Sequence, residues 1–312
     1  MAEIILHHYP VSPYSEKIRA ILGYKNLAWR SVIIPIVMPK PELLPLTGGY
    51  RKTPALQIGA DIWCDSKLIA RVLERLQPAP TLLPTGREAT CVMQEQWSEK
   101  FFLLSVPLVV MQPAGQKHVF RDYPEVPPEK FLKDRAALFT GGSQGRASAG
   151  ATRAEMPGLL ALLEAQLASA PFIDGEAPTM SDFALYHPVW FLLSNPGVAA
   201  YYDPYPRIRE WAGRMASFGH GRPEPLGGAE ALRIAAAATP QPVGGSVDAA
   251  EGFRAGERVV VAATDYGVDP VEGELLRADA QEIAIRRQDP QAGELVVHFP
   301  RAGFRLARKE AG

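Results

Sequence analysis

The chain has 312 residues, of which 47% are hydrophobic and 21% are charged, and its formal net charge is −1. This composition is ordinary for a globular protein, and so small a net charge provides no overall field that would attract nucleic acid or a membrane surface. The first three residues, Met-Ala-Glu, lack the basic start of a signal peptide. The longest apolar run, 101–111, is shorter than the ~20 residues that span a bilayer. We therefore expect a cytoplasmic protein with neither nucleic acid nor a membrane as a partner.

The N-terminus predicts a strand, a turn and a helix. Residues 4–8 are an apolar run typical of a buried strand. Ser12 and Pro13 then begin a helix, because a serine hydroxyl caps a free amide and proline suits the first helical position. A helix N-terminus presents free N–H groups and a positive dipole end. A sulfur held there ionises more easily, since thiol pKa values fall from about 8.5 to roughly 3.5–7.5 in such places.

The next sixty residues continue in a regular order. The segment 35–50 holds four prolines and is expected to be a loop with a short helix. The expected strands lie at 28–34, 55–58 and 61–64. The expected helices are a short one near 42–46 and an amphipathic one at 66–76. A βαβ unit followed by a ββα unit predicts a thioredoxin-like domain, which we assign to residues 1–78.

Two dipeptides in this domain have features of a binding site. Thr53-Pro54 comes directly before a strand, where this fold carries a cis-proline, and the exposed backbone of Thr53 can pair with an extended peptide. Asp65-Ser66 lies at the next strand-to-helix junction. The serine there can hold a carboxylate and the aspartate an ammonium, the two charges of a γ-glutamyl group. The simpler interpretation is that Ser12 and Asp65 are only helix caps.

Together, Ser12-Pro13-Tyr14-Ser15, Thr53-Pro54 and Asp65-Ser66 resemble the glutathione-binding domain of serine-type glutathione transferases. The resemblance implies that Ser12 is the catalytic residue and donates a hydrogen bond to the glutathione sulfur. It implies that the Thr53 backbone, before a cis Pro54, pairs with the cysteinyl part of glutathione. It also implies that Asp65 and Ser66 hold the γ-glutamyl part.

The glycine carboxylate of glutathione usually meets a basic residue in this family. Lys52 is our candidate, with Lys40 and Arg51 as alternatives. The chain departs from the family pattern in two places. It has Thr53 where Val is more common and Asp65 where Glu or Gln is more common.

A proline-rich linker at 77–86 is followed by a segment with helical patterning up to residue 238. Thr179 and Asp182 match a capping box, which glutathione transferases carry in the buried helix of their second domain. We therefore assign residues 87–238 to an all-helical domain. The expected helices are 87–111, bent near Pro107, then 128–138, 156–168, 205–218 and 229–238, with a mobile loop at 140–150.

The C-terminal segment has an all-β pattern. Five expected strands lie at 258–262, 273–277, 282–287, 294–299 and 304–306. Their spacing predicts a small SH3-like barrel over 253–312, which ordinary glutathione transferases lack. Nine basic and ten acidic residues lie in this segment, so it has no basic excess for nucleic acid. A protein contact or intramolecular docking fits this barrel better.

The sequence therefore predicts three parts, one α/β, one all-α and one small and all-β. The resemblance implies an enzyme that uses glutathione as co-substrate and whose bound thiolate attacks a small electrophile. A non-catalytic glutathione-binding or scaffold protein, whose β-barrel mediates protein interaction, is the alternative. Glutathione-dependent reduction is a third possibility. No metal is expected, because His7 and His8 are adjacent on a strand and point to opposite faces. The family resemblance alone implies a homodimer.

Overall fold

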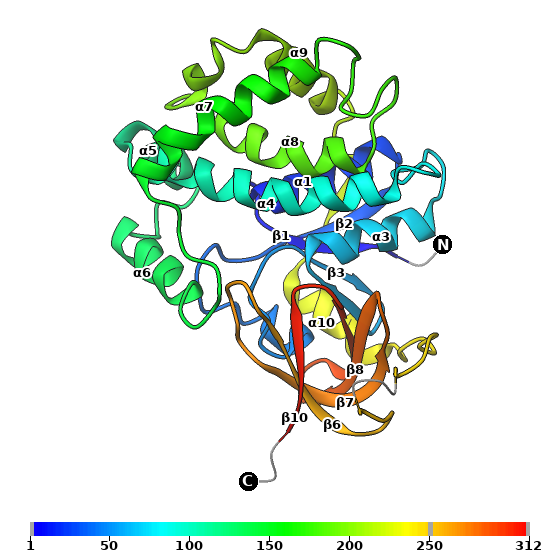
Figure 1. The fold of residues 1–312 in the computed structure, drawn as a ribbon. Helices are drawn as coiled ribbons and strands as arrows, with labels where there is room; N and C mark the ends of the chain where they lie inside the picture. Colours follow the sequence, from blue (N-terminus) through cyan, green and yellow to red (C-terminus); the bar gives the residue numbers. More distant parts are fainter. Residues whose placement is uncertain (1–2, 249–251, 310–312) are drawn as a thin grey trace.

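The computed structural model describes residues 3–248 and 252–309. Figure 1 shows a helical part at the top, a mixed β-sheet in the middle and a β-rich C-terminal part at the bottom. The strands are β1 (Ile5–His8), β2 (Ala28–Ile33), β3 (Ala55–Ile58), β4 (Asp61–Cys64), β5 (Arg222–Pro225), β6 (Arg258–Ala263), β7 (Val271–Ala278), β8 (Glu282–Asp289), β9 (Gly293–Pro300) and β10 (Phe304–Arg308). The helices are α1 (Pro13–Tyr24), α2 (Leu44–Thr47), α3 (Ser66–Leu76), α4 (Glu88–Val110), α5 (Pro113–Phe120), α6 (Pro128–Leu138), α7 (Ala149–Gln166), α8 (Met180–Leu193), the 3-10 helix η1 (Ala199–Tyr202), α9 (Pro206–Ala216) and α10 (Gly228–Ala237).

Among the described residues, ten strands form one continuous sheet in the order β10-β6-β7-β8-β9-β4-β3-β1-β2-β5. Strands β1 and β2 are parallel, and β3 and β4 form the predicted antiparallel hairpin. Helices α1 and α3 cover one face of this part of the sheet, and α2 and α10 lie on the other (Figure 1). The first eighty residues therefore have the thioredoxin-like arrangement expected from the sequence.

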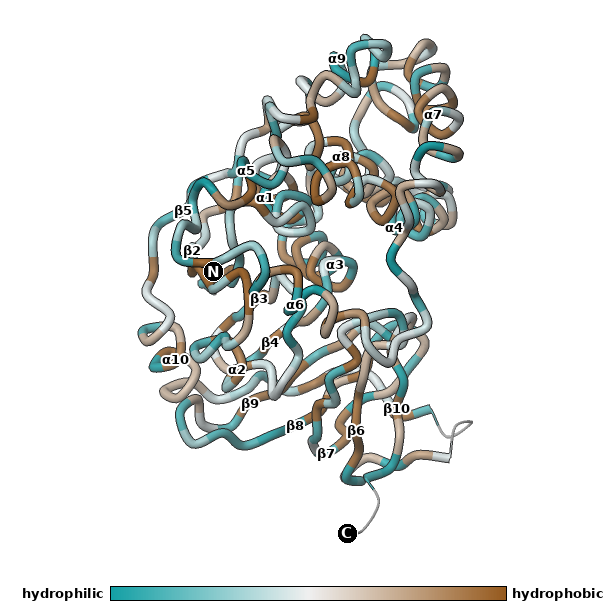
Figure 2. Tube along the Cα trace, turned by 90° about the vertical axis from the view of Figure 1, so that its left-hand side faces the viewer, coloured by the Kyte–Doolittle hydropathy of each residue, from teal (hydrophilic) through white to brown (hydrophobic). Residues whose placement is uncertain are grey.

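The helical part is built around α8. Met180–Val189 is buried throughout, and Figure 2 shows α8 as a predominantly hydrophobic segment among α1, α4 and α9. The predicted capping box begins this helix, because Asp182 accepts a hydrogen bond from the Thr179 amide at 2.9 Å and the Thr179 side chain accepts one in return. Asp182 also accepts from the Trp211 indole N–H at 2.9 Å. One buried carboxylate thus joins the start of α8 to α9.

The C-terminal strands β6 to β10 form an antiparallel series that continues the thioredoxin-like sheet. Strand β9 pairs in parallel with β4, with Ile62 opposite Val297. The five strands therefore extend the sheet at an edge that β4 would otherwise leave open. We call residues 253–309 the C-terminal β unit; its assignment to the SH3-like barrels stays a prediction.

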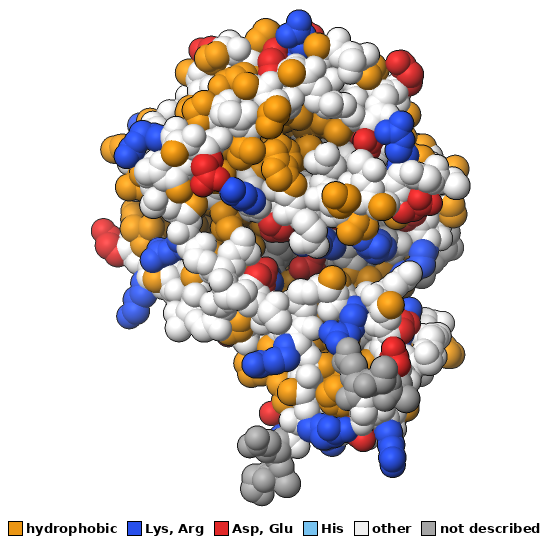
Figure 3. All heavy atoms as spheres, in the orientation of Figure 1, with side chains coloured by type: hydrophobic (Ala, Val, Ile, Leu, Met, Phe, Trp, Pro, Cys, Tyr) orange, Lys and Arg blue, Asp and Glu red, His pale blue; other side chains and the backbone are white. Residues whose placement is uncertain are grey.

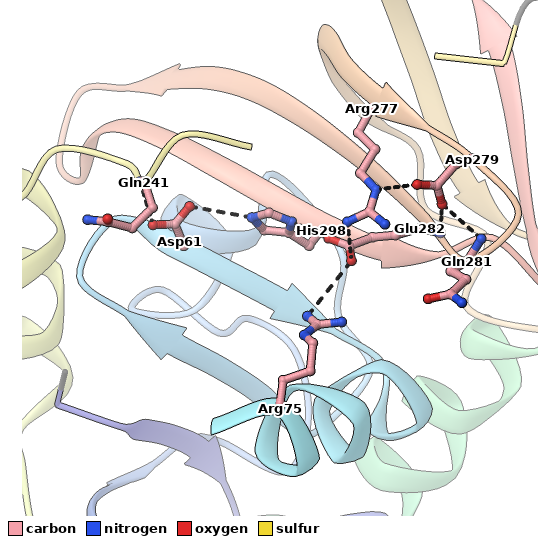
Figure 4. A network of polar contacts seen from close by, with 8 residues as sticks. All are labelled: Asp61, Arg75, Gln241, Arg277, Asp279, Gln281, Glu282 and His298. Atoms are coloured by element: carbon pink, nitrogen blue, oxygen red, sulfur yellow. Dashed lines mark hydrogen bonds and ion pairs between the residues drawn. The ribbon is translucent and has the colours of Figure 1, made fainter. Parts of the chain in front are cut away.

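A buried polar network crosses the seam between β4 and β9 (Figure 4). His298 lies between two carboxylates, with Nδ1 2.6 Å from Glu282 Oε1 and Nε2 3.4 Å from Asp61 Oδ1. Its ring stacks on Trp63 at 4.8 Å. Burial lowers the pKa of His298, but the hydrogen bonds to Asp61 and Glu282 outweigh it and raise the pKa above its usual value. The seam therefore contains a histidine whose pKa is raised by the two carboxylates beside it.

Four features differ from the sequence expectations. Helix α10, expected to end the helical domain, packs instead against the sheet, with Ala231 in one cluster with Ile5 and Val32. Strand β5 pairs in parallel with β2 and was not expected. Helix α7 begins at Ala149, seven residues before the predicted start. The segment 140–150, expected to be a mobile loop, is partly held by Ser143 and Gln144, whose amides donate to carbonyls of the C-terminal β unit.

No described helix, within 3–248 and 252–309, is long and apolar enough to cross a membrane.

Candidate functional site

The strand register brings the three sequence motifs to one edge of the sheet. Ala55, which follows Pro54 directly, pairs with His7 of β1 on one side and with Cys64 of β4 on the other. Neighbouring strands lie ≈ 4.8 Å apart, so the end of β1, the start of β3 and the end of β4 are adjacent. Ser12 follows the first, Thr53-Pro54 precedes the second and Asp65-Ser66 follows the third.

Ser12 is the N-cap of α1. Its Oγ accepts a hydrogen bond from the Ser15 amide at 3.2 Å, and its carbonyl accepts from the Glu16 amide at 3.0 Å. Among the described residues this is the hydrogen bond recorded for Ser12 Oγ, and in it the hydroxyl oxygen is the acceptor. Ser12 is only 2% exposed. The helix-cap interpretation of Ser12 is thus confirmed, and this cap does not use the hydroxyl proton.

Arg19 holds the turn that carries Ser12. Its guanidinium donates to the carbonyl of Pro10 at 2.8 Å and to that of Tyr9 at 3.3 Å. Glu16 accepts from the same guanidinium at 2.7 Å, and this pair is buried. The sequence analysis did not select Arg19, although a Glu and an Arg three positions apart on a helix are a usable signal.

Thr53-Pro54 has a cis peptide bond, as predicted. Lys40 lies behind this turn, with Nζ donating to the Arg51 carbonyl and to Thr53 Oγ1, both at 2.9 Å. Burial lowers the pKa of Lys40 to about 7, and the charge of Arg135 contributes. Lys40 therefore supports the Thr53 turn from inside the protein.

Asp65 adopts a left-handed backbone conformation with φ 74°, which is uncommon for a residue with a side chain. Its carboxylate accepts from the Lys67 amide at 2.9 Å and so caps α3. Ser66 is the first residue of that helix and is 5% exposed. Such strained residues concentrate at ligand sites, so the cap and a binding function are compatible here.

Lys52 is ion-paired with a residue from the C-terminal β unit. Its Nζ lies 2.9 Å from Asp265 Oδ1 and 4.6 Å from the centre of the Tyr266 ring. The alternative cation Arg51 is ion-paired with Asp134 at 2.6 Å. The basic residues proposed for the glycine carboxylate therefore each have a protein partner.

Tyr266 reaches from the C-terminal β unit to the first turn of α1. Its hydroxyl donates to the Tyr14 hydroxyl at 3.4 Å, and Tyr14 donates to Glu99 Oε2 at 2.6 Å. Lys67 lies 3.3 Å from the other oxygen of Glu99. Sequence reasoning missed Glu99, Asp265 and Tyr266, and no motif marks them.

The surface is hollowed between the helical part and the β-rich part, and acidic side chains are visible in the hollow (Figure 3). Within the residues that the structure describes, no group of three or more His, Cys, Asp or Glu side chains is arranged to hold a metal ion. His7 Nε2 is instead 2.8 Å from Gln57 Oε1, and His8 Nε2 is 2.9 Å from Ser31 Oγ. Cys64 and Cys91 are both free and buried.

Two family models match the chain. Residues 6–81 match the glutathione S-transferase N-terminal domain, and residues 146–214 match the glutathione S-transferase C-terminal domain. The crystal structure of a GST-like protein from Pseudomonas syringae is similar over 99% of this chain and 100% of its own, with 40% sequence identity and a TM-score of 0.80. The chain belongs to the glutathione S-transferase family. A comparison with curated proteins found no match.

More distant glutathione S-transferases share the fold over about two thirds of this chain. The enzyme from Rhodospirillum rubrum has 19% identity and a TM-score of 0.50, covering 69% of this chain and 88% of its own. Poplar glutathione transferase F1 has 15% identity and a TM-score of 0.50, covering 69% and 93%. The match to the Pseudomonas syringae protein, in contrast, includes almost all of this chain.

Proposed function

We propose that this family member binds glutathione at the edge formed by Ser12, Thr53-Pro54 and Asp65-Ser66 and uses its thiolate to attack a small electrophile. The observation that carries the proposal is the strand register, which makes the three motifs neighbours. A tripeptide lying along this edge can meet all three at once. Glutathione is then a co-substrate.

Ser12 would donate its hydroxyl proton to the glutathione sulfur. A hydrogen bond to an ionised acceptor is stronger than one to a neutral acceptor, so the donor favours the thiolate over the thiol. The N-terminus of α1 adds a positive dipole end beside the same sulfur. Arg19 contributes indirectly, because it holds the carbonyls of the turn before Ser12. The thiol proton goes to solvent, and the thiolate sulfur forms the new bond to the electrophile. The electrophile either releases its leaving group as an anion or, in an addition, takes up the electron pair of the bond that opens and a proton from solvent.

The other motif residues would hold the peptide. The Thr53 backbone pairs with the cysteinyl residue, in the manner of an added strand, and Pro54 fixes the turn. Ser66 and the α3 N-terminus take the γ-glutamyl carboxylate, and Asp65 takes its ammonium. Lys52 is the candidate for the glycine carboxylate. We also expect a homodimer from the family, which size-exclusion chromatography with light scattering would test.

The test has two parts on the whole protein. Calorimetric titration with glutathione measures binding, and ultraviolet difference absorbance measures the fraction of bound thiolate. A panel of electrophiles then measures conjugation. Binding with thiolate formation at neutral pH and turnover supports the enzyme. Binding without turnover supports the non-catalytic alternative, and no binding overturns both.

A further inference from the structure

The loop between β6 and β7, residues 264–270, lies against the proposed glutathione site. On one side it contacts Lys52, and on the other it contacts the end of α6 and the segment after it. Phe139 stacks on Tyr266, with ring centres 4.7 Å apart. The loop belongs to the C-terminal β unit, so it adds a wall to the proposed site from outside the thioredoxin-like part.

Backbone hydrogen bonds hold this loop in place. The amides of Ser143 and Gln144 donate to the carbonyls of Thr264 and Asp265, at 2.9 and 3.0 Å. The Gly267 amide donates to the Leu138 carbonyl at 2.6 Å. Asp265 therefore faces Lys52 from a backbone fixed on both sides.

The Lys52 ammonium has little room for a second anion. Its Nζ is paired with Asp265 and lies 4.6, 5.7 and 5.9 Å from the ring centres of Tyr266, Phe304 and Tyr50. The Lys52 side chain is 11% exposed and that of Asp265 is 34% exposed, so the pair is shielded from solvent mainly on the lysine side. A free carboxylate that approaches Lys52 meets the negative charge of Asp265 at the same time.

The two alternative cations, Arg51 and Lys40, also already have partners within the protein. Arg51 is paired with Asp134, and Lys40 donates to the Arg51 carbonyl and to Thr53. A free terminal carboxylate must therefore displace Asp265 from Lys52 or share the ammonium with it. A ligand whose terminal carboxyl is an amide has no such requirement.

We propose that Asp265 is a specificity-determining residue that competes with the terminal carboxylate of the ligand for Lys52. The site accordingly favours γ-glutamyl thiol peptides whose terminal carboxyl group is masked as an amide. This inference rests on the proposed function, because it concerns the same site. If it is correct, the C-terminal β unit helps to determine which thiol peptide the site binds.

The test compares two ligands, glutathione and its C-terminal glycine amide, by calorimetric titration. The proteins are the wild type, Asp265→Asn, Lys52→Met and the double variant. Asp265→Asn should bind glutathione roughly tenfold more tightly and leave affinity for the amide nearly unchanged, since it removes one close like charge. When Lys52 is already replaced by Met, the increase in glutathione affinity caused by Asp265→Asn should be much smaller. Asp269→Asn changes the same charge on the same loop, at a residue with no recorded ion pair to Lys52, and serves as the matched control.

The outcomes separate the two proposals. If Asp265→Asn alters affinity for both ligands equally, or weakens glutathione alone, Asp265 is not a competitor and this inference fails while the proposed function stands. If the wild type and Asp265→Asn both bind neither ligand, both proposals fail. Binding of glutathione by Asp265→Asn but not by the wild type would support both. Thermal unfolding of each variant identifies any that does not fold, and Asp265→Glu, which keeps the charge, should then behave as the wild type.

Discussion

The hydroxyl of Tyr266 lies 3.4 Å from the hydroxyl of Tyr14, two residues after Ser12. This contact joins the C-terminal β unit to the first turn of α1. Tyr14 in turn donates to Glu99 on α4. The thioredoxin-like part, the helical part and the C-terminal β unit therefore all meet at the helix whose N-terminus carries the proposed thiolate donor.

Ser12→Ala should lower turnover of glutathione conjugation roughly 10- to 100-fold while changing the Kd for glutathione only a few-fold, because the donor acts mainly on the charged sulfur. Steady-state kinetics and titration measure the two quantities. Ser12→Thr keeps the hydroxyl and should retain most activity. Ser15→Ala removes a neighbouring buried hydroxyl that forms no recorded hydrogen bond among the described residues. A greater loss in Ser15→Ala than in Ser12→Ala would transfer the donor function to Ser15.

Asp182→Asn should destabilise the protein by about 2 kcal/mol, since several donors converge on this carboxylate and an amide offers a single acceptor oxygen. The donors are the amides of Ile173 and Thr179 and the indole N–H of Trp211. Denaturant unfolding measures the loss. Asp269→Asn makes the same change at a half-buried residue with no recorded hydrogen bond among the described residues and is the control. If Asp182→Asn has the same free energy of unfolding as the wild type, the hydrogen bonds to Asp182 make no net contribution to stability.

His298 should make stability depend on pH. Its folded pKa is raised, so its contribution is fully present below the unfolded value of 6.5 and is lost as pH rises through the higher folded value. The pKa of Glu282 is lowered from 4.5: burial opposes this shift, but the hydrogen bond and charge of His298 outweigh it. The Glu282 contribution is therefore present above 4.5 and is lost as pH falls through its folded pKa.

His298→Gln should accordingly cost about 3 kcal/mol near pH 6, and the difference from the wild type should shrink as the pH rises toward 9. Thermal unfolding across this range measures it. His118→Gln is the comparison, because the pKa of His118 is lowered, chiefly by partial burial. A His298→Gln deficit that stays constant with pH would mean that the ring is neutral in the folded protein.

Gly142→Ala should loosen the contact between the helical part and the loop 264–270. A Cβ at Gly142 would lie 1.8 Å from the Asp265 carbonyl oxygen, so the two backbones must separate, at a cost of about 1–3 kcal/mol. Limited proteolysis should then cut within 264–270 faster. Gly145→Ala is the matched control, because a Cβ there meets nothing within 4 Å. Equal cleavage rates in the two variants would contradict the expected separation.

Much of the fold followed from local pattern. The Ser12-Pro13 helix start, the hairpin of β3 and β4 and the Thr179–Asp182 capping box each depend on residues a few positions apart. That the three motifs belong to one site was implied by the family resemblance, and the strand register is what makes them neighbours. Strand β5, in contrast, reads Arg-Pro-Glu-Pro, and two prolines in four residues argue against a strand except at a sheet edge.

The contacts between distant segments could not be predicted in this way. The pattern of β9 indicates a strand but does not indicate that its partner is β4. For the same reason nothing in the sequence places Asp265 beside Lys52 or Tyr266 beside Tyr14. These contacts depend on how two separately patterned units dock, which requires the surface shape of both. They are also the contacts on which the specificity proposal depends.

The pairing of β4 with β9 has a consequence for biosynthesis. Strand β4 ends at Cys64, whereas β9 begins at Gly293, so at ~5–20 residues per second the ribosome needs on the order of ten to fifty seconds to deliver the missing neighbour. During that interval the nascent chain carries an unsatisfied row of backbone donors and acceptors, the kind of surface that chaperones cover and that promotes association between unfinished chains.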